Sequence, residues 1–89
     1  MSQRIAFKVH GTVQGVNFRS FTKSRAESYG LTGWVKNSSD GKVIGEAQGD
    51  QHSIDKLVQD LNKGPSAAQV TKLDKESIDT KVGESGFQA

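Results

Sequence analysis

Early in the chain, apolar residues first recur at every second position and then at every third or fourth position. In RIAFKVH, residues 4–10, Ile5, Phe7 and Val9 alternate with polar residues. This alternation predicts a β-strand, because successive side chains of a strand face opposite sides. The next apolar positions predict a helix that ends at Gly30, which tolerates left-handed backbone. The helical spacing is carried by Phe18, Phe21, Thr22, Arg25, Ala26 and Tyr29.

Two further strands are predicted next. LTGWVKN, residues 31–37, and KVIGEAQG, residues 42–49, have strand character, and Asp40-Gly41 between them is typical of a hairpin turn. Gly45 within the second segment indicates that another group approaches the backbone closely there.

A second helix follows and is the clearest element of the pattern. Asp50 or Ser53 can cap its start, and Gly64-Pro65 closes its end. AQVTKLD, residues 68–74, then predicts a fourth strand. The helix has apolar residues at i, i+3, i+4 and i+7, namely Ile54, Leu57, Val58 and Leu61.

The predicted order is therefore βαββαβ. Two split βαβ units of this kind form the ferredoxin-like α/β sandwich, an α+β fold whose two helices cover one face of an antiparallel four-stranded sheet. We expect one domain, residues 1–89, because a chain of 89 residues is too short for two cores. This fold serves many functions, so the function depends on the site.

Composition narrows the functional classes. The chain has no cysteine, which excludes disulfides, thiolate nucleophiles and zinc–thiolate sites. No segment has the ~20 apolar residues of a membrane span, and the start of the chain lacks the apolar run of a secretory signal. We therefore expect a cytoplasmic protein that does not act on a membrane.

The charges are mixed. Twelve basic and ten acidic residues are interspersed, without the basic block that marks a nucleic-acid-binding arm. The sequence pI of about 9.0 gives a mild bias toward small anionic ligands.

The usual catalytic side chains are not grouped. His10 and His52 lie outside any triad motif, so each is interpreted as a surface or capping residue. Asp50, Asp55 and Asp60 are five residues apart and spread around the second helix. Neither a metal site nor a cofactor is expected.

The segment GTVQGVNFRSF, residues 11–21, joins the first strand to the first helix and can hold an anion. The helix N-terminus gathers backbone N–H groups and partial positive charge. Gly15 allows close approach of an oxyanion, and Arg19 can form two parallel hydrogen bonds with phosphate oxygens. The segment matches neither nucleotide-loop fingerprint. On spacing alone, an ordinary turn with a surface arginine explains it equally well.

Two motifs favour the anion site. GTVQGVNFR resembles the first signature of the acylphosphatase family, G-x-V-Q-G-V-x-[FM]-R. GWVKNSSDGKVIGEAQG, residues 33–49, resembles the second, G-[FYW]-[AVC]-[KRQAM]-N-x(3)-G-x-V-x(5)-G. Every fixed position matches in both motifs, and the resemblance extends over the whole chain.

The resemblance implies a metal-independent, monomeric enzyme that hydrolyses acyl phosphates to a carboxylate and inorganic phosphate. Arg19 corresponds to the family's phosphate-binding arginine, and Asn37 to the asparagine that positions the attacking water. Inorganic phosphate is expected as product and inhibitor. The resemblance also implies that the amides of one loop cradle the phosphate. This loop comprises Gln14, Gly15, Val16, Asn17, Phe18 and Arg19.

The C-terminal segment departs from the family pattern. Family members often have a final strand with alternating apolar residues beyond the phenylalanine, whereas only Gln88 and Ala89 follow Phe87 here. We expect at most a short fifth strand, and a sheet edge that is less well protected.

Two alternatives compete with the enzyme. RNA-binding modules share this order of elements, but their third strand carries stacking aromatic residues, which KVIGEAQG lacks. A non-catalytic acylphosphatase-like domain is the other alternative, and the intact Arg19 and Asn37 argue against it.

Overall fold

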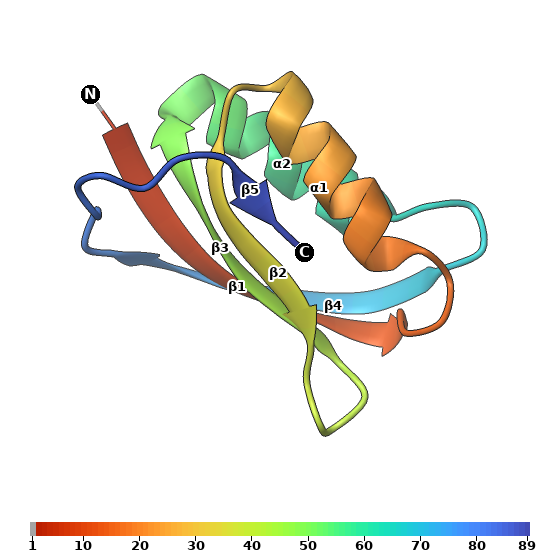
Figure 1. Cartoon of the computed structure of the whole chain (residues 1–89). Coiled ribbons are helices and arrows are strands. Elements are labelled where there is room, and N and C mark those ends of the chain that lie inside the picture. Colours follow the sequence, from red (N-terminus) through yellow and green to blue (C-terminus); the bar gives the residue numbers. More distant parts are fainter. Residues whose placement is uncertain (1) are drawn as a thin grey trace.

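The computed structural model describes residues 2–89, in which two helices pack on one face of a five-stranded sheet (Figure 1). The elements are β1 (Ser2–Thr12), α1 (Phe18–Ser28), β2 (Thr32–Asn37), β3 (Val43–Asp50), α2 (Gln51–Lys63), β4 (Gln69–Ile78) and β5 (Phe87–Gln88). The sheet order is β4-β1-β3-β2-β5. The first four strands pair antiparallel, and β5 pairs parallel with β2. This confirms the predicted βαββαβ sandwich.

Strands β1 and β4 are longer than the sequence pattern predicts. They pair from Arg4 opposite Ile78 to Thr12 opposite Gln69, with a register shift between His10 and Gly11. The residues beyond the predicted ends are mostly polar, so their strand conformation comes from pairing with the neighbouring strand rather than from their own propensity.

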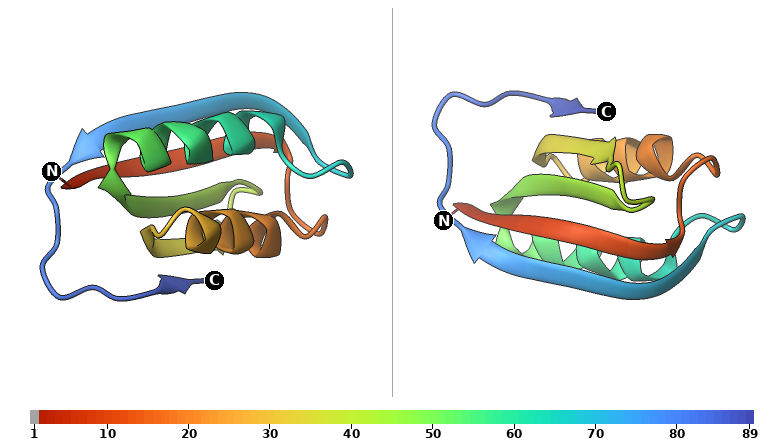
Figure 2. Two further views of the ribbon diagram at one scale, coloured as in Figure 1. Left: turned by 90° about the horizontal axis from the view of Figure 1, so that it is seen from above. Right: turned by 90° about the horizontal axis from the view of Figure 1, so that it is seen from below.

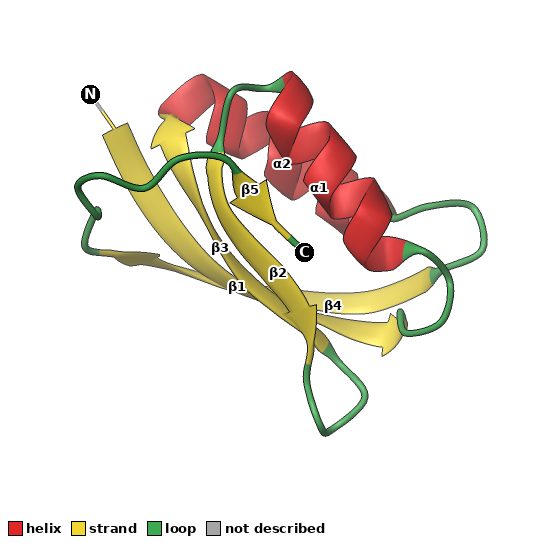
Figure 3. Ribbon diagram, in the orientation of Figure 1, coloured by secondary structure: helices red, strands yellow, loops and turns green. Residues whose placement is uncertain are grey.

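The core lies between the sheet and the two helices, which Figure 3 shows on the same side of the strands. Alternate residues of β1 are buried there, as the sequence predicts: Ile5, Phe7 and Val9. Helix α2 contributes Ile54, Leu57 and Leu61, and α1 contributes Phe18, Thr22 and Ala26.

Two local predictions are confirmed. The side chain of Asp50 caps α2 by accepting a hydrogen bond from the backbone N–H of Ser53 at 2.8 Å. At Gly45, a Cβ atom would lie 2.4 Å from the carbonyl oxygen of Trp34 and 2.5 Å from the ring of Phe7. The backbone of β3 therefore needs a glycine at this point.

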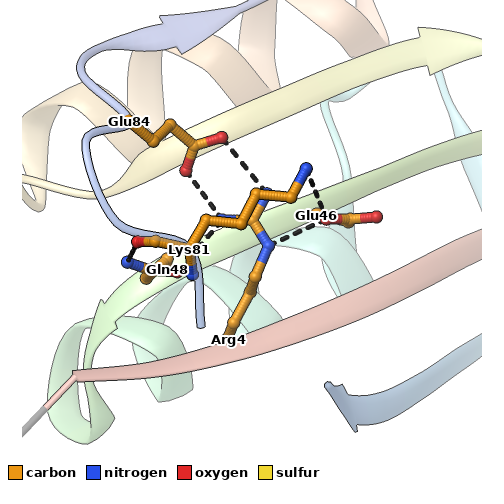
Figure 4. A network of polar contacts seen from close by, with 5 residues as sticks. All are labelled: Arg4, Glu46, Gln48, Lys81 and Glu84. Carbon is orange, nitrogen blue, oxygen red and sulfur yellow. Dashed lines mark hydrogen bonds and ion pairs between the residues drawn. The ribbon is translucent and has the colours of Figure 1, made fainter. Parts of the chain in front are cut away.

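A buried arginine anchors the C-terminal segment, which has only a weak sequence pattern. The side chain of Arg4 is fully buried. It donates to Glu46 at 2.8 Å, to Gln48 at 3.1 Å and, through two bonds, to Glu84 (Figure 4). Gln48 also exchanges two hydrogen bonds with the backbone of Lys81, at 2.8 and 2.9 Å.

The anchored segment between β4 and β5 runs from one edge of the sheet to the other. Figure 2 shows the segment after β4 passing the N-terminal end of β1 and reaching the side where β5 lies. Strand β5 has two residues, as short as the sequence predicts. Phe87 within it is buried in the core, and the backbone N–H of Gly33 bonds to the carbonyl of Gly86 at 3.1 Å.

Candidate active site

The loop between β1 and α1 meets the hairpin between β2 and β3. Strands β1 and β2 both run antiparallel to β3, so their C-terminal ends lie at the same end of the sheet (Figure 1). A hollow of about 330 Å³ lies at that end of the sheet, and both Arg19 and Asn37 line it. Its lining consists of Val13, Gly15, Asn17, Phe18, Arg19, Ser20, Asn37 and Ala89.

The backbone of the β1–α1 loop is curled. Gly15 has φ 74° and Asn17 has φ 63°, whereas Val16 between them does not have positive φ. Where right- and left-handed backbone conformations alternate, successive N–H groups point to one side and bind anions, and the positive φ angles of Gly15 and Asn17 are consistent with this arrangement. For Asn17 the left-handed conformation is uncommon but tolerated.

The start of α1 leaves its first amides available. Asn17 is the N-cap residue, but its side chain makes no capping hydrogen bond. The first helical bond runs from the N–H of Phe21 to the carbonyl of Asn17, at 2.9 Å. The N–H groups of residues 18–20 have no partner inside the helix, and their partial positive charge favours an anion in the hollow.

Arg19 provides the charge of the site. It lies in the first turn of α1 and its side chain is exposed. Within residues 2–89, no carboxylate lies within ion-pair distance of it, whereas Arg25 on the same helix lies 4.0 Å from Asp60 and over the ring of Phe21. The Arg19 guanidinium is therefore free to bind an anionic ligand.

Asn37 reaches the hollow from the sheet. It is the last residue of β2 and pairs with Val43 of β3. It lies on the same side of the strand as the buried Val35, two residues earlier. Its side chain makes no hydrogen bond within the described chain, so the amide can both donate to and accept from a ligand or water.

The predicted phosphate loop divides into two parts. Gly15, Asn17, Phe18 and Arg19 line the hollow, whereas Gln14 and Val16 do not. The side chain of Gln14 is turned to the β2–β3 hairpin, and Val16 packs against the core.

Sequence reasoning missed three lining residues: Val13, Ser20 and Ala89. Ser20 could have been found, since it is in the first turn of α1 directly after Arg19. Ala89 could not, because its place depends on the path of the C-terminal segment and on the anchor at Arg4 and Glu84.

The remaining candidate residues lie elsewhere. Nε2 of His10 is 2.7 Å from Oδ2 of Asp74, and this contact lowers the pKa of the Asp74 carboxyl. His52 is an exposed residue of the first turn of α2. Trp34 stays outside the hollow, with Nζ of Lys36 5.4 Å from its ring centre. The positions of the two histidines agree with the surface or capping roles predicted for them.

The described residues form neither a candidate metal site nor a membrane-spanning helix. Between residues 2 and 89, no group of three or more His, Cys, Asp or Glu side chains could hold a metal ion. In the same part of the chain, no helix is long and apolar enough to cross a membrane.

The family model named acylphosphatase matches residues 5–89. The chain belongs to the acylphosphatase family. It is 38% identical over 86 residues to an acylphosphatase of Salinibacter ruber, covering 97% of this chain and 90% of the relative.

Solved acylphosphatase structures have the same fold. An acylphosphatase from Coxiella burnetii superimposes with a TM-score of 0.92 at 40% identity, covering 98% of this chain and 90% of that one. An acylphosphatase from Bacillus subtilis also gives 0.92, at 32% identity, and covers 99% of this chain and 97% of the other.

Proposed function

We propose that this protein is an acylphosphatase that hydrolyses the carboxyl–phosphate bond of acyl phosphates, releasing a carboxylate and inorganic phosphate. The observation that carries the proposal is the shared hollow: Arg19, at the uncapped start of α1, and Asn37, at the end of β2, line it together. Family membership supports the same activity.

The phosphate is held by Arg19 and by backbone amides around Gly15, Asn17 and Phe18. Phosphoryl transfer needs mainly positioning and stabilisation of charge on the equatorial oxygens. A guanidinium supplies two parallel donors for them, and preorganised amides add stabilisation without reorganising during the reaction.

Asn37 positions the attacking water. An amide is too weak a base to deprotonate water, and no histidine lines the hollow in the described chain. We assign the proton to the substrate: as the water oxygen bonds to phosphorus, its proton passes to a phosphate oxygen. The bond from phosphorus to the acyl oxygen breaks, and the carboxylate leaves without a general acid.

The RNA-binding alternative is not favoured. Strands β1 and β3 are the central strands that such modules use for base stacking. Lys8 and His10 of β1, and Ile44 and Glu46 of β3, alternate with the buried residues and occupy the face away from the helices. The described part of these two strands offers no Phe, Tyr or Trp on that face.

The proposal includes one catalytic domain over residues 1–89, a monomeric state and inorganic phosphate as a competitive inhibitor. The monomeric state is an expectation from the resemblance to the acylphosphatase family. Cytoplasmic location stays a prediction of the sequence.

The test is hydrolysis of benzoyl phosphate in the presence of EDTA. We expect turnover that survives chelation and is inhibited competitively by inorganic phosphate. Folded protein without turnover would contradict the enzymatic function and favour the non-catalytic alternative. Tight, salt-sensitive binding of single-stranded RNA would instead favour the RNA-binding module.

A further inference from the structure

The side chain of Gln14 joins the two halves of the site. Its amide nitrogen donates to the backbone carbonyl of Ser38 and to that of Lys42, each at 2.9 Å. Gln14 belongs to the loop that lines the hollow, and Ser38 directly follows Asn37. One partly buried side chain therefore spans from the phosphate loop to both sides of the β2–β3 hairpin.

The hairpin is closed without this side chain. The N–H of Ser38 bonds to the carbonyl of Lys42 at 2.8 Å, and the N–H of Gly41 bonds to the carbonyl of Ser38 at 3.3 Å. Both carbonyls that Gln14 contacts thus have a partner within the hairpin. What Gln14 adds is the placement of the hairpin relative to the loop.

The other side-chain link from β1 to the hairpin is weaker. Nζ of Lys8 lies 3.0 Å from Oδ2 of Asp40, but these side chains are 40% and 51% exposed. Exposed ion pairs of this kind contribute little, about 0–1 kcal/mol. Gln14 makes two hydrogen bonds in a less exposed place, so it is the stronger of the two constraints.

We propose that Gln14 is a positioning residue: it fixes the water held by Asn37 at the correct distance from the phosphate held by the loop. This inference rests on the proposed function. Gln14 does not touch the phosphate through its side chain, because both N–H bonds of its amide are directed at the hairpin carbonyls. Its contribution is geometric, and misplacement of reacting groups by about 1 Å can cost about a hundredfold in rate.

The test uses Gln14→Met, which keeps an unbranched side chain of similar length and removes both donors without adding charge. We expect kcat for benzoyl phosphate to fall at least about tenfold, while the inhibition constant of inorganic phosphate stays within about twofold. A purely structural role would not separate these two quantities.

The matched control is Gln48→Met. Gln48 is also a half-buried glutamine that donates to a backbone carbonyl, that of Lys81 at 2.9 Å, but it does not line the hollow. The bonds from Arg4 to Glu84, which hold the C-terminal segment, remain in this variant. We therefore expect its kcat to stay within about twofold of the unsubstituted protein, even where the free energy of unfolding falls.

Two results would overturn the positioning role. One is Gln14→Met with unchanged kcat; the other is a phosphate inhibition constant that rises in step with the loss of kcat, which would assign Gln14 to phosphate binding. A readout that needs no turnover separates this inference from the proposed function. Backbone ¹⁵N order parameters of residues 38–42 should fall in Gln14→Met and not in Gln48→Met, and unchanged values would also count against the inference.

Discussion

The guanidinium of Arg4 and the carboxylate of Glu84 form two parallel hydrogen bonds, of 2.7 and 3.1 Å, across 80 positions of the sequence. The Arg4 side chain is fully buried and that of Glu84 is 20% exposed. Hydrogen bonding to Arg4 lowers the pKa of the Glu84 carboxyl. This pair connects the first strand to the segment that delivers β5 to the opposite edge of the sheet.

Replacing Glu84 by Gln should destabilise the protein in a pH-dependent way. At pH 7 we expect a loss of about 2 kcal/mol in the free energy of unfolding, typical of a hydrogen bond to a charged group. Because folding lowers the pKa of Glu84, its stabilisation is fully present above the unfolded pKa of about 4.3 and disappears as pH falls through the folded pKa. Urea unfolding at several pH values measures this.

A second measurement makes the Glu84 prediction specific. The difference between the two proteins should shrink below about pH 4. A matched control is Glu27→Gln, which removes an exposed carboxylate 3.7 Å from Lys23 on α1 and should change stability by less than about 0.5 kcal/mol. A loss from Glu84→Gln that is the same at every pH would show that the pair does not act through its charge.

Arg19→Ala should weaken phosphate binding and catalysis together. The substitution removes the only cationic side chain among the described lining residues. We expect kcat to fall by about 10²–10³-fold and the phosphate inhibition constant to rise at least about tenfold. Steady-state kinetics with benzoyl phosphate and inorganic phosphate measures both quantities.

Arg25→Ala is the control for Arg19→Ala. Arg25 is on the same helix but pairs with Asp60 and the ring of Phe21, so its loss should leave kcat and phosphate inhibition near their original values. If the two alanine variants had the same kinetics, Arg19 would have no special place in the site.

Asn37→Ala should lower kcat without weakening the binding of inorganic phosphate. In the proposed mechanism the amide positions the water but does not hold the phosphate, so kcat should fall about a hundredfold while inorganic phosphate still inhibits with nearly the same constant. The control is Asn62→Ala, which removes an exposed amide that donates to Val58 on α2. Retention of full turnover by Asn37→Ala would exclude the water-positioning role.

Most elements of the fold could be predicted because they have a local signal. Alternation marks β1, the spacing of Ile54, Leu57 and Leu61 marks α2, and Asp50 marks the start of that helix by its side-chain chemistry. The full length of β4 has no such signal, because residues 75–78 adopt strand conformation through pairing with β1.

The candidate site could be predicted to the extent that it is encoded in contiguous motifs. Arg19 and Asn37 are recognised from the two signatures, and the sheet topology then brings them together. The direction of the Gln14 side chain and the position of Ala89 depend on contacts between distant segments. The hydrogen bonds of Gln14 join it to residues 24 and 28 positions further along the chain, and such contacts produce no periodic pattern in the sequence.

Gly45→Ala should destabilise the protein although Gly45 lies in a regular strand. The new Cβ atom would lie 2.4 Å from the backbone carbonyl oxygen of Trp34, which cannot move without disturbing β2, and 2.5 Å from the ring of Phe7. Overpacking of this kind typically costs about 1–3 kcal/mol. The free energy of unfolding from urea titration measures the loss.

Gly30→Ala shows what backbone strain alone costs. Gly30 has φ 72°, and a Cβ atom there would meet nothing within 4 Å, so only the left-handed strain of about 1–2 kcal/mol is expected. Gly45→Val would then distinguish overpacking from backbone strain. Its larger side chain should reduce the free energy of unfolding well beyond the effect of Gly45→Ala. Equal stability of Gly45→Ala and the unsubstituted protein would mean that Phe7 and β2 can move apart freely.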